Sequence, residues 1–233
     1  MSDQSVSNER RRELEQMDPF QEALAKGLTY ASENRKQLFL ILGAVVVVCV
    51  VFSAIMFSFK RSEITASRLV ADATRQYGES YAKDKDFKKG YDAVKDSFQS
   101  VFEDYSNTNA GRLALVTFAK ICFDAGEYDK AYILYLDALD TLGNEAGMEN
   151  FMLSVLGNLS QIRNEPEKAK SYYLRIEKGS SDLLKDEARF SLALLYEADN
   201  DLEASLKMYE KILKENENSI YRAIAESKVA GIQ

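Results

Sequence analysis

The feature that most constrains this chain is an apolar run from Leu38 to Phe59 that contains no charged side chain. Arg35 and Lys36 precede the run, and Lys60 and Arg61 follow it. As a helix rising about 1.5 Å per residue, the run reaches roughly 33 Å, enough to cross a hydrocarbon core of about 30 Å. A signal peptide has a shorter apolar region, of about 7–15 residues, and a buried core helix of this length rarely lacks every charge. We therefore predict one transmembrane helix over residues 38–59, in contact with membrane lipid.

This run separates a tail, residues 1–36, from a larger part, residues 62–233. In the tail, Asp18 followed by Pro19 is typical of a helix start. Apolar residues then recur at helical spacing, so we expect a short amphipathic helix over residues 18–33. This helix either lies at the membrane interface or only leads into the membrane helix. Basic residues flank both ends of the span, so charge alone leaves the orientation open.

Composition argues against several functional classes. The formal net charge is −7, and acidic residues outnumber basic ones after the span as well, which argues against a nucleic-acid partner. The chain has no histidine, the commonest general base and metal ligand. Cys49 lies in the apolar run and Cys122 is the only other thiol, so no intramolecular disulfide is expected. Glycine-rich phosphate-binding motifs are missing too. We predict no catalytic residues, no metal and no cofactor, and hence not an enzyme. The alternative to a binding protein is an enzyme with an unrecognised carboxylate site.

Beyond Arg61, apolar residues recur every three or four positions, and one layout of two helices around a turn occurs three times, at residues 114–139, 151–176 and 189–213. Small residues occupy matched places in these segments. They are Ala119, Gly157 and Ala193 in the first helices, and Ala131, Ala169 and Ser205 in the second helices. A tyrosine follows each small residue of the second helices by four positions, at Tyr135, Tyr173 and Tyr209. Small residues allow two helices to approach closely, and we expect each tyrosine to fill the gap to the next hairpin. A single hairpin cannot bury its apolar face, so the units must stack.

The predicted fold class is all-α, with one transmembrane helix followed by a helical-hairpin solenoid and a C-terminal capping helix. The hairpins are expected at about 62–105, 110–142, 149–178 and 183–215, and the capping helix at 219–230. Within the capping helix, Ile220, Ala223, Ile224 and Ser227 share one face. We expect this face to pack inward and the opposite face to contact water.

Two segments, GEYDKAYILYLDAL and LGNLSQIRNEPEKAKSYY, resemble the tetratricopeptide repeat closely. The shared signature is a small residue in the first helix, Gly or Asn at the turn, Ala in the second helix and Tyr four residues later. The resemblance implies a solenoid whose first helices line a concave protein-binding groove, here Val116, Lys120, Phe123, Asn158, Gln161, Phe190, Leu194 and Glu197. Phe123 and Phe190 are equally interpretable as core residues. Val116, Val155 and Glu187 occupy the places where a carboxylate clamp needs Lys, Asn and Arg, so capture of a C-terminal carboxylate is not expected.

The chain is also similar, over essentially its full length, to the Sec translocon ancillary subunit family of bacterial inner-membrane proteins. The segments SENRKQLFLILG and FEDYSNTNAGRLALVTFAKICFDAGEYDKA carry this resemblance. It implies a cytoplasmic N-terminus, one span and a periplasmic repeat domain. It also implies association with Sec translocon subunits and work beside a periplasmic chaperone on secreted clients. An envelope-assembly adaptor unrelated to secretion is the alternative. The oligomeric state does not follow from the sequence.

Overall fold

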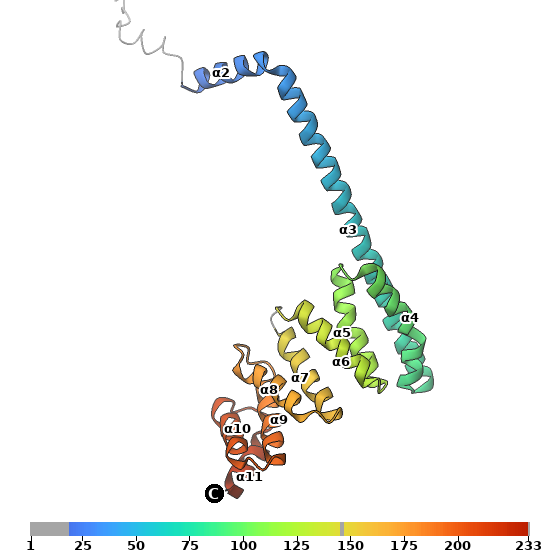
Figure 1. The fold of residues 1–233 in the computed structure, drawn as a ribbon, viewed down its shortest axis with the longest axis vertical. Coiled ribbons are helices and arrows are strands. Elements are labelled where there is room, and N and C mark those ends of the chain that lie inside the picture. Colours follow the sequence, from blue (N-terminus) through green and yellow to red (C-terminus); the bar gives the residue numbers. More distant parts are fainter. Residues whose placement is uncertain (1–18, 145–146, 233) are drawn as a thin grey trace, which may run out of the picture. The chain divides into compact units, whose positions relative to one another are not determined.

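A computed structural model describes residues 19–144 and 147–232, which form ten helices and no strand (Figure 1). The chain divides into two compact units, Met1–Phe59 and Lys60–Gln233. Helix α3 (Arg35–Asp84) passes through the boundary between them. The all-helical content agrees with the fold class predicted from the apolar periodicity.

The first unit contains α2 (Pro19–Glu33) and the N-terminal part of α3. Side chains from Leu38 to Phe59 are all exposed, as expected for a helix that is to be surrounded by lipid rather than by protein. Within the described residues, α3 is the one helix long and apolar enough to cross a membrane. The unit is therefore compatible with a single-pass membrane protein. The expected helix start at Asp18 lies outside the described residues.

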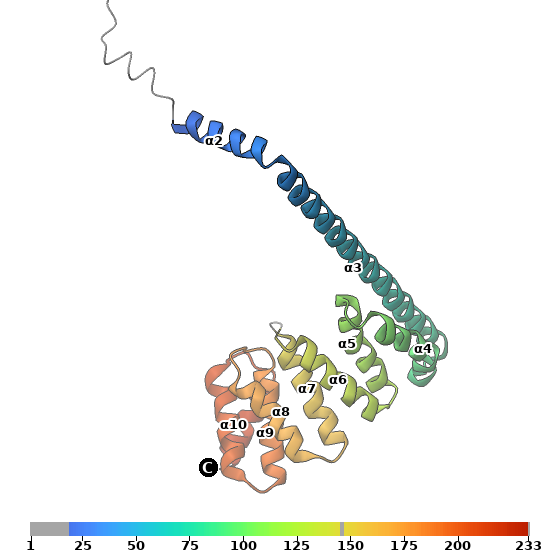
Figure 2. The same cartoon turned by 45° about the horizontal axis from the view of Figure 1, so that its top comes forward.

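The second unit is a series of helical hairpins, in which successive helices pack against one another (Figures 1 and 2). The C-terminal part of α3 precedes α4, and α5/α6, α7/α8 and α9/α10 form the next three hairpins before a last helix, α11. Their bounds are α4 Phe87–Tyr105, α5 Asn109–Asp124, α6 Tyr128–Leu142, α7 Met148–Ile162, α8 Pro166–Lys178, α9 Lys185–Ala198, α10 Leu202–Glu215 and α11 Arg222–Ile232. This arrangement is the hairpin solenoid with a C-terminal capping helix that the repeats predict.

The turns inside the last three hairpins have the same backbone geometry. Gly126, Asn164 and Asn200 adopt positive φ angles of 78°, 64° and 62°. In each turn the next residue donates its amide to a carbonyl in the first helix, at 2.9 Å, 2.8 Å and 2.9 Å respectively. Glycine and asparagine adopt this left-handed conformation at the lowest cost, and it satisfies carbonyls at a helix end. The recurrence of Gly or Asn in the sequence thus has a conformational cause.

The matched small residues and tyrosines of the repeats are buried. Tyr135 contacts Phe151 of the following hairpin, with ring centroids 6.4 Å apart, as expected for a residue that fills the gap between hairpins. Tyr173 instead lies against Gly157 of its own hairpin, and Tyr209 contacts Phe190 of its own hairpin at 6.3 Å. The tyrosines therefore stabilise the helix pairs within hairpins as well as the stacking between them.

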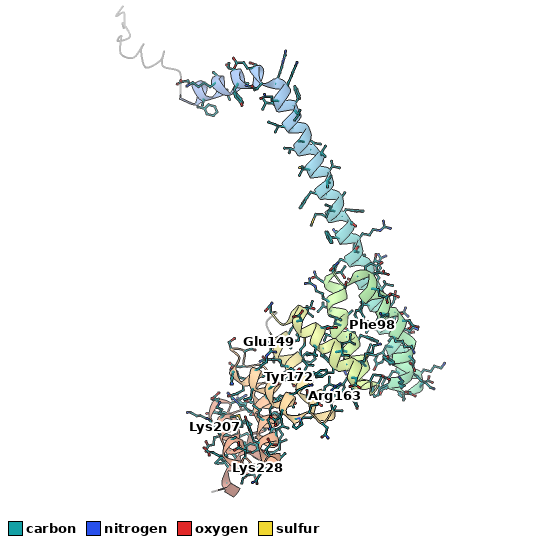
Figure 3. All side chains as sticks on the ribbon, in the orientation of Figure 1. Phe98, Glu149, Arg163, Tyr172, Lys207 and Lys228 are labelled. Atoms are coloured by element: carbon teal, nitrogen blue, oxygen red, sulfur yellow. The ribbon has the colours of Figure 1, made fainter. Side chains whose placement is uncertain are left out.

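Helix α3 is joined to the hairpin that follows α4 through the Glu63 carboxylate. Glu63 accepts hydrogen bonds from the backbone amides of Asn109 and Ala110, at 2.7 Å and 2.9 Å. These amides belong to the first turn of α5, where they have no partner within the helix. Further along the helix, Phe118 of α5 stacks on Phe98 of α4, which is fully buried, with ring centroids 4.7 Å apart. Figure 3 labels Phe98. A carboxylate cap thus holds the start of α5, and an aromatic contact holds its second half.

Helix α11 caps the second unit, but the prediction of its inward face was wrong. Ile220 is 85% exposed and Ile224 47% exposed, and Ala223 and Ser227 are exposed too. The inward side instead carries Tyr221, Ala225, Lys228 and Val229, because Tyr221 stacks on Phe190 and Lys228 forms an ion pair with Glu197. Specific aromatic and ionic contacts, rather than apolar periodicity, set the rotation of this helix.

A candidate protein-binding groove

Two adjoining hollows lie on the side of the solenoid formed by the first helices of the hairpins. They hold about 330 and 360 Å³, and Lys120, Asp124, Tyr135 and Phe151 line both. Each volume is at the lower end of the range of ligand pockets, about 300–1,000 Å³. We call the two hollows together the groove. Its remaining lining residues are Thr74, Tyr77, Val116, Thr117, Ile121, Phe123, Ser154, Val155, Asn158, Leu184 and Glu187.

Four of the eight sequence-predicted binding residues line this groove, namely Val116, Lys120, Phe123 and Asn158. Phe123 is half-buried and makes an edge contact with Tyr128, the ring centroids being 5.6 Å apart. It therefore borders both the groove and the core. A binding role for these four residues stays a prediction.

The other four predicted residues lie outside the lining of the groove. Gln161 donates a hydrogen bond to the Tyr173 hydroxyl at 2.9 Å, and Leu194 is exposed. Phe190 stacks on Tyr221 at 4.5 Å, and Glu197 pairs with Lys228 at 2.7 Å. The segment that leads into α11, and α11 itself, thus cover Phe190 and Glu197.

The floor of the groove contains phenol groups that stay neutral near physiological pH. Burial and the nearby Asp124 carboxylate raise the pKa of Tyr77 to about 12. Burial, followed by Asp124 and Cys122, also raises the pKa of Tyr135 to about 12. Both hydroxyls are therefore protonated and can donate hydrogen bonds. The floor can thus contact apolar groups through its rings and acceptors through its hydroxyls.

Three charged residues line the groove. The Lys120 ammonium lies 2.8 Å from Asp124 Oδ2, one helical turn away on α5. Glu187, in the first turn of α9, accepts a hydrogen bond from the Ser154 hydroxyl. With one cation against two carboxylates, the groove is slightly acidic.

Sequence reasoning missed most of the floor. Tyr77 belongs to α3, which the repeat pattern does not cover, and Tyr135 was assigned only to the gap between hairpins. Phe151, in the first turn of α7, is not one of the matched residues of the repeat. Val155 and Glu187 could have been predicted to line the groove, because both occupy positions that form the carboxylate clamp in the repeat family.

Two features of the described residues bear on metal binding and on thiol reactivity. Among residues 19–144 and 147–232, no group of three or more His, Cys, Asp or Glu side chains is placed to hold a metal ion. Cys122 is buried, and burial raises the pKa of its thiol to about 12, so the nucleophilic thiolate is scarcely populated.

Comparison with known proteins supports the fold. No protein-family model matches the chain, and no curated protein matches it. Among solved structures, the chain is similar to a tetratricopeptide repeat protein from Parabacteroides merdae ATCC 43184, with 23% identity and a TM-score of 0.50. The match covers 66% of this chain and 59% of that protein, so the chain spans less than two thirds of its length. At this identity the likeness concerns the fold, and the fold of this chain is a tetratricopeptide-like helical solenoid.

Proposed function

We propose that this chain is a membrane-anchored protein-binding scaffold that serves as an ancillary subunit of the Sec translocon. The observation that carries the binding part is the apolar groove on the first-helix side of a tetratricopeptide-like solenoid. Such solenoids commonly use this side to bind extended or helical peptide segments. The uncharged part of α3 supports the membrane anchor. The resemblance of the segments around the span and α5 supports the translocon.

The groove is suited to an apolar segment that carries a Lys or Arg. Because Lys120 is already paired with Asp124, the Glu187 carboxylate is the remaining charge of the lining. A cationic side chain of the bound segment would meet Glu187, while its apolar neighbours contact Phe123, Phe151 and Tyr135. The Glu187→Lys variant should weaken binding of such a segment, whereas Glu203→Lys on the exposed side of α10 should not.

The proposed topology places the N-terminus in the cytoplasm and the repeat domain in the periplasm of a bacterial inner membrane. The resemblance supports this orientation, since the flanking charges do not decide it. With the outer membrane permeabilised, added protease should digest the repeat domain and leave a small fragment that contains the span. Protection of the repeat domain until the inner membrane is broken would place the domain in the cytoplasm.

Site-specific photo-crosslinking tests the functional proposal. Crosslinkers at Val46 or Val50 in the apolar run should capture translocon subunits, and crosslinkers at Lys120 or Asn158 should capture secreted chains or a periplasmic chaperone. A crosslinker at the exposed Lys207 of α10 serves as the control for non-specific capture (Figure 3).

Replacement of residues 38–59 by an unrelated apolar helix separates the two leading hypotheses. Tethering raises the effective concentration of a second site to around millimolar, so a weak groove depends on a correctly docked span. The replacement should therefore abolish capture by the span and reduce capture by the groove. If every partner is retained, the span is only an anchor, and the envelope-assembly adaptor is the better description.

A further inference from the structure

The two hollows of the groove share the Asp124 carboxylate. Asp124 lines both of them, together with Lys120 and the rings of Tyr135 and Phe151. Its side chain is 20% exposed, whereas that of Lys120 is 65% exposed. Burial and then the Asp124 carboxylate raise the pKa values of Tyr77 and Tyr135 to about 12. The carboxylate thus lies beside aromatic rings, in the part of the groove that the two hollows have in common.

Asp124 occupies an unfavourable position in its own helix. It is the last residue of α5, and the last turn of this helix carries no basic residue. The carbonyl end of a helix has a partial negative charge, which disfavours a carboxylate and attracts a cation. The faces of the aromatic rings in the lining attract cations as well. The helix end, the carboxylate and the rings therefore all favour a positively charged group at this point.

Lys120 shows which chemical group this carboxylate binds. Its ammonium donates hydrogen bonds to both carboxylate oxygens of Asp124, at 2.9 and 2.8 Å. The pair is easily exchanged, because the lysine is mostly exposed and exposed ion pairs contribute little to stability. A lysine four residues before a carboxylate is also the less favourable order within a helix. A cation on a bound segment can therefore replace Lys120, whose ammonium then returns to water.

We propose that Asp124 is a second cation site of the groove, at which a lysine or arginine of the bound segment replaces Lys120. This inference rests on the proposed binding function and deepens it. Glu187 receives one cation of the segment and Asp124 receives another, since both carboxylates line the same hollow of about 330 Å³. The preferred partner is then an apolar segment with two basic residues rather than one. Lys120 is an internal competitor that pairs with Asp124 while the groove is empty.

Binding of labelled peptides to the full-length chain in an uncharged detergent tests the site by fluorescence anisotropy. The probe is a short fluorescein-labelled peptide of Leu, Phe and Ala that carries two lysines, and matched peptides carry glutamine in place of one or both. Asp124→Asn keeps the shape of the side chain and removes its charge. It should weaken binding of the two-lysine peptide about tenfold, the size expected for one hydrogen bond to a charged group. Binding of the lysine-free peptide should change little.

Lys120→Gln gives the sharper result, because the expected effect has the opposite sign. Without the internal competitor, the two-lysine peptide should bind severalfold more tightly, whereas Lys207→Gln on the exposed side of α10 should change nothing. The Lys120–Asp124 pair is partly exposed, so neither variant of the pair should shift the melting temperature appreciably. Weaker binding by Lys120→Gln would mean that this lysine itself contacts the peptide, and would overturn the proposal.

Glu187→Lys separates a failure of this site from a failure of the groove. If Glu187→Lys weakens binding of the two-lysine peptide and Asp124→Asn does not, the groove binds one cation and the second site is wrong. If no peptide binds, or if neither carboxylate affects binding, the groove and the site within it are both overturned.

Discussion

Phe123 and Phe190 carry the same side chain and were both open to interpretation as groove or core, yet their surroundings differ. Phe123 lines the groove, while Phe190 lies between Tyr221 and Tyr209. Because Phe190 is enclosed on two sides, replacing it by Asp would either bury a carboxylate or force the helices to separate. The distinction depends on Tyr221, which precedes α11 and covers Phe190 but not Phe123. The sequence around the two phenylalanines does not predict this contact.

We expect Phe190→Asp to destabilise the domain by several kcal/mol, a large part of a typical total of about 5–15 kcal/mol. Phe123→Asp should cost less, about 1–2 kcal/mol, and should weaken partner capture because its side chain borders the groove. Thermal unfolding followed by circular dichroism, together with crosslinking yield, measures the two effects separately. Equal losses of stability would mean that Phe123 is a core residue as well.

Gly157 is the position where the repeat requires the absence of a side chain rather than merely a small one. A Cβ there would lie 2.6 Å from the Tyr173 ring, which is buried and hydrogen-bonded to Gln161. Gly157→Ala should therefore destabilise by about 1–3 kcal/mol through overpacking, which exceeds the gain of about 1 kcal/mol from helix propensity. Gly78→Ala in α3 is the matched control, because nothing lies within 4 Å of the added Cβ. The control should stabilise slightly. Stabilisation by both variants would show that Tyr173 can shift.

Among the elements, α8, α9 and α10 are joined by an ion-pair network around the buried Arg189–Glu177 pair. Arg189 of α9 donates a hydrogen bond to Glu177 of α8 at 2.6 Å, and Lys211 and Glu215 of α10 pair with Glu177 and Arg189 respectively. Burial would raise the pKa of Glu177, but hydrogen bonds from Lys211 and Arg189 outweigh it and lower the pKa. The three helices are thus held by groups whose contribution depends on pH.

Because the folded pKa of Glu177 is lowered, its stabilising contribution is present above the pKa of the unfolded chain, about 4.3. The contribution is lost as the pH falls from there through the folded pKa. Glu177→Gln should therefore lower the melting temperature near pH 7 and flatten its decline below about pH 4.5. The exposed Glu203→Gln on α10 should leave the profile unchanged. A wild-type profile in the Glu177→Gln variant would assign the acid sensitivity to other carboxylates.

For the whole molecule, the apolar part of α3 is long enough to cross a membrane. Its exposed apolar side chains should keep the full-length chain in membranes through an alkaline carbonate wash, which removes peripheral proteins. A chain that begins at Ser62 should appear in the soluble fraction and keep its helical signal. Release of the full-length chain by carbonate would contradict a membrane span.

Sequence alone determined the all-α class, the hairpin repeat and the apolar run, because each depends on local periodicity or on a residue with special backbone freedom. Gly126, Asn164 and Asn200 mark turns through their own φ preference, and an uncharged run is apolar whatever surrounds it. Only the tertiary structure decided the rotation of α11, the cover over Phe190 and the contribution of Tyr77 and Phe151 to the groove. These features depend on contacts between helices far apart in the sequence, where a stacked ring or an ion pair outweighs the apolar pattern of a single helix.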